Sequence, residues 1–230
     1  MENTGKAAIA EFIATFGLVF IGASAVILNS SSGVLDLTGV ALAQGLVLAI
    51  MVSITAHLSG GFVNPAVTIG VWVAGKIPSG RAAVLIVAQL LGAIAGAYLV
   101  KFLFPPIVYD AGTGGAAVLN SQIASGKWIV LEAVGTFLLV FAVFGTAMDE
   151  RGPYAKTAGL TIGLVIAFDI MAFGPLTGAA VNPARWLGPA LAAGAWDNWF
   201  VWIVGPVAGA IVAAVVYSMV FLRDQQLTTL

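Results

Sequence analysis

Apolar residues fall in six long runs along this chain of 230 residues, and each run is about as long as a membrane is thick. A transmembrane helix needs roughly 20 consecutive apolar residues. The runs do not alternate apolar and polar positions, which excludes a transmembrane β-barrel. We therefore predict six spanning helices, near Ala7–Asn29, Thr38–His57, Arg81–Phe104, Lys127–Met148, Ala155–Phe173 and Trp199–Leu222.

Turn-forming residues separate the runs. The connectors contain Ser30 to Gly33, Pro105-Pro106, Gly112 to Gly115, and Arg151-Gly152-Pro153. Two further apolar stretches, Asn64–Ala74 and Asn182–Ala192, are too short to span a bilayer and favour re-entrant segments. The predicted fold class is an all-α membrane protein with six transmembrane helices and two re-entrant half-helices.

Composition agrees with this class and narrows the chemistry. Hydrophobic residues make up 60% of the chain and charged residues only 8%, against about 25% charged residues in soluble domains. There is no cysteine and only one histidine, His57. We therefore expect no metal site and no Ser-His-Asp catalytic group. Since no phosphate loop or dinucleotide motif is present either, we expect no enzyme activity, no cofactor and no nucleic-acid partner.

Lysine and arginine are distributed unevenly between the two ends of the predicted spans. Alternating the connectors between sides places six of the nine basic residues on the side of the termini. Positive residues concentrate on the cytoplasmic side of membrane proteins, which predicts that both termini are cytoplasmic. The six are Lys6, Lys76, Arg81, Arg151, Lys156 and Arg223, whereas Lys101 and Lys127 flank a connector on the other side.

The two halves of the chain repeat each other. The segment around Glu11 matches the segment around Glu132, and a motif at Asn64 recurs at Asn182. Each half holds three predicted spans, an odd number, so the halves must have opposite orientations in the bilayer. We predict one transmembrane domain over 1–230, built from inverted repeats at about 1–110 and 120–230, with its site at the repeat interface near the midplane.

The repeated motif is Asn-Pro-Ala, and it opens both short stretches. Proline suits the first position of a helix, and asparagine suits the N-cap before it. Two half-helices entering from opposite faces would bring their positive N-terminal ends together at mid-membrane. The two copies are Asn64-Pro65-Ala66 and Asn182-Pro183-Ala184, the second being followed by Arg185.

With paired Asn-Pro-Ala motifs in two inverted halves, the whole chain resembles the aquaporin, or major intrinsic protein, family. The resemblance implies that Asn64 and Asn182 donate hydrogen bonds to passing water and that Arg185 lies in a narrow selectivity filter. It implies that Glu11 and Glu132 are buried acceptors for the half-helix loops. It also implies a homotetramer with one pore per protomer.

The resemblance places the other filter positions at Gln44, Ile170 and Ala179, where water-selective members typically have an aromatic residue and a histidine. The Ile, Ala and Arg set is similar to the plant vacuolar subfamily, which implies ammonia, urea or peroxide as further solutes. Trp186 replaces the Asp that usually follows the second motif in glycerol facilitators, yet Gly174 to Gly178 resembles that branch. His57 is either a pore-mouth residue or an interfacial histidine.

The expected function is passive conduction of water that excludes protons and ions, in the plasma membrane among lipids. The alternative is a broader facilitator for glycerol, ammonia, urea or hydrogen peroxide. A rival from another class is a secondary active transporter, whose ion-coupling residues would be Glu11, Glu132 and Asp169. Otherwise we expect Asp169 to cap a loop at the outer end of its span.

Small and aromatic residues suggest further contacts. Gly92 with Gly96, and Gly205 with Gly209, form small-xxx-small pairs that predict close helix packing. Three tryptophans at the start of the last span, Trp196, Trp199 and Trp202, predict an interfacial aromatic belt.

Overall fold

The computed structural model describes residues 3–124, 126–151 and 157–222, so the predicted turn residues Gly152 and Pro153 and the basic residues Lys156 and Arg223 lie outside it. Six of its helices are long and apolar enough to cross a membrane, which confirms that prediction. They are α1 (Thr4–Ser32), α2 (Asp36–Ser59), α4 (Ser79–Leu103), α6 (Lys127–Val143), α7 (Ala158–Thr177) and α9 (Val201–Tyr217). Short π-helical segments extend α6 over Phe144–Met148 and α9 over Ser218–Leu222. The shorter elements are α3 (Pro65–Val73), α5 (Pro106–Ala111), a 3-10 turn at Thr113–Gly115 and α8 (Pro183–Ala193).

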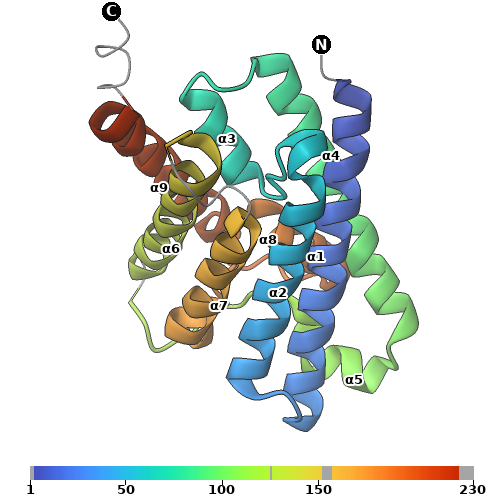
Figure 1. Ribbon diagram of the computed structural model, residues 1–230. Coiled ribbons are helices and arrows are strands. Elements are labelled where there is room, and N and C mark those ends of the chain that lie inside the picture. The colour runs from blue at the N-terminus through green and yellow to red at the C-terminus, as the bar shows by residue number, and fades with distance from the viewer. Residues whose placement is uncertain (1–2, 125, 152–156, 223–230) are drawn as a thin grey trace, which may run out of the picture.

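The long helices form one bundle around the two half-helices (Figure 1). The beginning of α1 and the end of α9 lie toward one end of the bundle, which we call the inner end. Helix α5 lies at the opposite, outer end. The half-helices α3 and α8 are each too short to cross the bundle, and α8 lies near its middle.

Glycines let the long helices approach each other closely. A Cβ built on Gly96 of α4 would lie 2.8 Å from the carbonyl oxygen of Phe16 in α1, and one on Gly92 would overlap the carbonyl oxygen of Phe12. In the second half, a Cβ on Gly205 of α9 would lie 2.9 Å from the carbonyl oxygen of Ile129 in α6. Apolar lipid gives helices no hydrophobic reason to associate, so close backbone packing of this kind holds them together. Both predicted glycine pairs are therefore packing contacts.

Trp202 corrects one expectation of the sequence analysis. Its ring is buried, stacks on Trp186 with 5.7 Å between ring centroids, and donates from Nε1 to the carbonyl oxygen of Thr177 at 2.9 Å. Trp196 and Trp199 are 44% and 53% exposed, as residues of an interfacial belt would be. The prediction was wrong for Trp202 because helix periodicity turns it inward, where the end of α7 offers a carbonyl acceptor.

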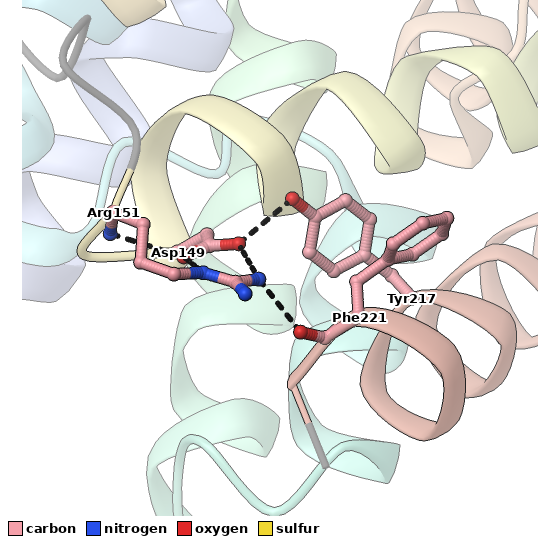
Figure 2. A network of polar contacts seen from close by, with 4 residues as sticks. All are labelled: Asp149, Arg151, Tyr217 and Phe221. Carbon is pink, nitrogen blue, oxygen red and sulfur yellow. Dashed lines mark hydrogen bonds and ion pairs between the residues drawn. The ribbon is translucent and has the colours of Figure 1, made fainter. Parts of the chain in front are cut away.

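A polar network at the inner end joins the connector after α6 to the end of the last helix (Figure 2). The Arg151 side chain donates to Asp149 from Nε to Oδ1 at 2.9 Å and from Nη2 to Oδ2 at 2.7 Å, and its backbone N–H donates to Oδ1 at 3.0 Å. Tyr217 donates its hydroxyl to Asp149 Oδ2 at 3.1 Å, and Arg151 Nη2 also reaches the carbonyl oxygen of Phe221 at 2.6 Å. Through these contacts the connector is attached to α9 and its π-helical extension.

Candidate functional site

The two half-helices meet through their asparagines. Asn64 caps α3 by accepting from the backbone N–H of Ala66 at 2.8 Å, and Asn182 caps α8 by accepting from Ala184 N–H at 2.9 Å. Each side-chain amide also donates across the junction. Nδ2 of Asn64 reaches the carbonyl oxygen of Val181 at 2.8 Å, and Nδ2 of Asn182 reaches that of Val63 at 3.0 Å. The two helix N-termini are thus held facing each other inside the bundle.

The backbone before each asparagine is strained. Val63 has φ of 54° and Val181 has φ of 40°, a region that β-branched residues rarely adopt. Such conformations persist only where the surrounding structure compensates their cost. Here the compensation comes from two carboxylates, because Glu11 Oε2 accepts from Val63 N–H and Glu132 Oε2 accepts from Val181 N–H, each at 2.6 Å.

Glu11 and Glu132 are both fully buried and occupy equivalent places. Glu11 also accepts from Phe62 N–H at 2.9 Å, and Glu132 accepts from Ala180 N–H at 3.0 Å. A hydroxyl at the end of the preceding helix also belongs to each set, donating to one carboxylate oxygen at 2.6 Å. It is Ser59 for Glu11 and Thr177 for Glu132. These are the loop-supporting hydrogen bonds that the family resemblance implies.

Gln89 of α4 is a member of the site that the sequence analysis missed. Its Nε2 donates to Glu11 Oε2 at 2.7 Å and to Thr68 Oγ1 of α3 at 2.9 Å. It is fully buried. A polar side chain inside an apolar span is a signal for function, so the glutamine in the middle of the third run could have been singled out.

Three cavities follow one another through the bundle. The outer one and the central one share Gln44 and Arg185 as lining residues. The central one and the inner one share Gly61, Val143 and Ile162. Most of the remaining central lining is aliphatic, and both asparagines face this cavity. The apolar central residues are Leu18, Leu48, Phe62, Val67, Leu139, Ile166, Ala179 and Ala180.

The four predicted filter positions lie around the neck between the outer and central cavities. Gln44 Oε1 accepts from Arg185 Nε at 3.2 Å, and both residues are buried. Ile170 lines the outer side of the neck and Ala179 the central side. Among the described residues, Nη1 of Arg185 has no hydrogen-bond partner although it is buried. The neck therefore combines the hydrogen-bonding groups of Gln44 and Arg185 with the aliphatic groups of Ile170 and Ala179.

Two further predicted residues lie elsewhere. Asp169 is 1% exposed within α7, so the expectation that it caps a loop was wrong, and its Oδ2 has no partner within the part of the chain that is described. Helix α7 runs on to Thr177, beyond the predicted end at Phe173, so Asp169 lies about two turns from the helix end, on its buried face. His57 is exposed near the inner end of α2, whereas Ser53 and Ala56 of the same helix line the inner cavity.

A family model described as major intrinsic protein matches residues 2–217. The chain belongs to the major intrinsic protein family. It is 42% identical over 226 residues to aquaporin TIP4-4 of Zea mays, covering 95% of this chain and 88% of that protein. It is 39% identical over 232 residues to aquaporin TIP2-1 of Arabidopsis thaliana, covering 96% and 89%.

The fold also matches a solved member of the family. The X-ray structure of the aquaglyceroporin from Plasmodium falciparum superposes with a TM-score of 0.86 at 27% identity, covering 98% of this chain and all of that one. Together with the six spanning helices, family membership makes this chain an integral, multi-pass membrane protein. Its relatives therefore include both proteins named aquaporin and one named aquaglyceroporin.

Proposed function

We propose that this major intrinsic protein is a passive water channel whose pore runs through the three aligned cavities. The observation that carries the proposal is the pair of capped asparagines at the central cavity, where two half-helix N-termini face each other. Membership in a family whose similar relatives are named aquaporins supports it. The aliphatic remainder of the lining offers a water molecule few other partners.

The asparagines explain how water passes while protons do not. A side-chain amide has two N–H donors, and the junction carbonyls use only one from each asparagine. The second donor of Asn64 and of Asn182 is left for the oxygen of a water in the central cavity. A water held by its oxygen on both sides points its hydrogens along the pore, so it cannot accept a proton from its neighbour. The two positive helix ends add a barrier to cations and protons.

Arg185 and Gln44 form the filter in this proposal. The guanidinium is a permanent positive charge at the neck, and it repels cations while its unpartnered Nη1 donates to a passing oxygen. Glu11 and Glu132 hold the loops in the strained shape that aims the asparagines. His57 stays a predicted pore-mouth residue.

Stopped-flow light scattering on proteoliposomes tests the water proposal. Vesicles that contain the protein should shrink faster in an osmotic gradient than empty vesicles. Ile170→Trp places an indole at the outer neck and should abolish the increase. Ile50→Trp is the matched control because Ile50 is 55% exposed on the lipid-facing side of α2. Wild-type rates equal to those of empty vesicles would overturn the proposal.

A second candidate function is conduction of small neutral solutes such as glycerol, ammonia, urea or hydrogen peroxide. The specific observation that favours it is the neck itself, where Ile170 and Ala179 offer no ring to narrow the opening. The similarity to a Plasmodium falciparum aquaglyceroporin also supports it. Reswelling of the same vesicles in a glycerol or urea gradient would establish it, and shrinkage without reswelling would exclude both solutes.

Assembly and orientation complete the proposal. We infer a homotetramer of inverted repeats in the cell membrane, with both termini in the cytoplasm. Lys76, Arg81 and Arg151 on the connectors of the terminal side support the orientation. Cross-linking in native membranes should give a tetramer ladder, and a protease added outside intact cells should leave terminal tags uncut.

A further inference from the structure

Gly22 of α1 lies directly behind the filter residue Gln44. A Cβ built on Gly22 would lie 3.1 Å from Cγ of Gln44 and 3.3 Å from both its Cδ and its Oε1. These are its three nearest atoms, and all belong to this one side chain. Gly22 is buried in the middle of a regular helix, where glycine is less favourable than alanine. A glycine is therefore explained at this position because Gln44 occupies the space that a side chain would need.

Gln44 has little freedom to give way toward the protein. The next residue, Gly45, packs against α7 so closely that a Cβ there would lie 2.7 Å from the carbonyl oxygen of Gly163. Helix α2 is thus held between α1 and α7 at the level of the filter. The free space beside Gln44 is the neck, since Gln44 lines both the central and the outer cavity. A group added at Gly22 would push the Gln44 side chain into the pore.

A small displacement there matters because Gln44 is bound to Arg185. The contact between Gln44 Oε1 and Arg185 Nε is 3.2 Å, close to the upper limit of a good N–H···O hydrogen bond. Non-bonded carbon atoms prefer separations of about 3.5–4.0 Å, so a methyl group on Gly22 would force Gln44 to move by a few tenths of an ångström. That movement narrows the neck and alters the hydrogen bond that orients the guanidinium.

We propose that Gly22 is a positioning residue for selectivity: it seats Gln44 so that the amide oxygen orients Arg185 and the neck stays open. The inference rests on the proposed function, because it assigns the neck to the permeation path. Gly22 acts through Gln44 and does not itself contact the permeant.

Gly22→Ala tests this, with Gly17→Ala as the matched control. Gly17 is on the same helix, and a Cβ there would also meet one flexible side chain of α2, Met51, at 3.0 Å. Met51 packs against the apolar core and, unlike Gln44, is not among the residues that line the outer and central cavities. In proteoliposomes with equal protein content, Gly22→Ala should lower the water permeability several-fold, and the control should keep the wild-type rate. Equal rates for the wild type and Gly22→Ala would overturn the proposal.

A double-variant cycle separates seating of Gln44 from a general disturbance of α1. In a Gln44→Ala background, Gly22→Ala should change the permeability no further, because the side chain it displaces is gone. The melting temperatures of the wild type, the two single variants and the double variant give a second cycle, and this one does not depend on conduction. If wild-type vesicles shrink no faster than empty ones, the proposed function fails, while coupling between Gly22 and Gln44 in melting temperature still supports the seating. Additive effects of the two changes on melting temperature would overturn the seating.

Discussion

Two buried glutamates each hold one half-helix loop, but they accept different numbers of hydrogen bonds. Glu11 receives four hydrogen bonds from the described residues, from Ser59, Phe62, Val63 and Gln89. Glu132 receives three, from Thr177, Ala180 and Val181. An ionised carboxylate away from water is costly unless its oxygens are satisfied. Gln89 is thus the group that gives the first half its additional support, and it also contacts Thr68 of the half-helix α3.

Replacing Gln89 by Leu should destabilise the protein. The change removes a buried donor to a charged acceptor, an interaction typically worth about 1.5–3 kcal/mol. We expect a lower melting temperature in detergent, followed through tryptophan fluorescence. Gln122→Leu is the control because Gln122 is exposed in the connector before α6. Equal melting temperatures for Gln89→Leu and the wild type would show that the Glu11 site tolerates three donors.

Ile170 should decide how large a neutral solute can pass. An Ile170→His variant adds an imidazole to the cavity that Ile170 and Arg185 both line, and it narrows the neck. We expect urea or glycerol permeability to fall by a larger factor than water permeability, both measured in the same vesicle preparation. Ile170→Val keeps an aliphatic group and serves as the matched control, with solute permeability at or above wild type. A solute-to-water ratio that stays unchanged in Ile170→His would remove Ile170 from the filter.

The repeated motif predicted the residues that line the site, but it did not predict the residues that hold them in place. Asn64, Asn182 and Arg185 could be found because a doubled Asn-Pro-Ala motif is rare and its capping physics is local. Gln89 and Gly22 act through partners 78 and 22 positions away in the sequence, Glu11 and Gln44. The residues around Gln89 and Gly22 in the sequence do not indicate these partners. For the same reason the predictions for Asp169 and Trp202 were wrong, because each depends on which face of a helix turns inward.

At the scale of elements, hydropathy located the helices and their caps set the ends. Helix α1 begins at Thr4, three residues before the predicted start, because Asn3 accepts from the backbone N–H groups of Gly5 and Lys6. It ends at Ser32 because Gly33 adopts φ of 68°, where the left-handed region favours glycine. Where the sequence predicts only a connector around Pro105-Pro106, the chain forms α5. Its Pro106 is at the first helical position, and buried Tyr109 ties it to the bundle.

The half-helix α8 ends against a lysine. Lys101 at the end of α4 donates from Nζ to the carbonyl oxygen of Ala192 at 2.6 Å. A cation near a helix C-terminus stabilises it through the helix dipole by about 0.3–1 kcal/mol, and more where it is partly buried. Because α8 carries Asn182 and Arg185 at its other end, Lys101 helps to hold these two cavity-lining residues in place.

Lys101→Met should therefore lower the melting temperature by an amount that corresponds to roughly 1 kcal/mol. Lys127→Met is a control of opposite sign, since Lys127 is the first residue of α6, where a cation opposes the helix dipole. We expect it to leave the melting temperature unchanged or raise it slightly. If both variants lose the same stability, removal of a lysine at the outer end, rather than the contact with α8, would be the cause.

At the scale of the whole molecule, the glycine contacts join spanning helices to one another, whereas the inner-end network joins a connector to a helix. Glycine contacts pair α4 with α1 and α9 with α6 within the halves, and α7 with α2 between them. The network of Asp149, Arg151 and Tyr217 instead joins an exposed connector to the end of the chain's last helix (Figure 2). Asp149 and Arg151 lie beyond the span that ends at Met148, whereas Tyr217 belongs to the last span. The ion pair of Asp149 and Arg151 should therefore respond to the pH of the solution at the inner end.

Asp149→Asn tests this link through its pH dependence. Hydrogen bonds from Arg151 hold the pKa of the Asp149 carboxyl well below its usual range. A carboxyl whose pKa is lowered by folding stabilises the folded protein above its unfolded pKa, about 3.9 for Asp, and loses that contribution as the pH falls toward the folded value. The melting temperature of Asp149→Asn should thus lie below wild type by a constant amount from neutral pH to about pH 5. The difference should shrink below about pH 4. Glu150→Gln, which removes the exposed neighbouring carboxylate, should match wild type throughout, and a deficit as large as that of Asp149→Asn would refute the link.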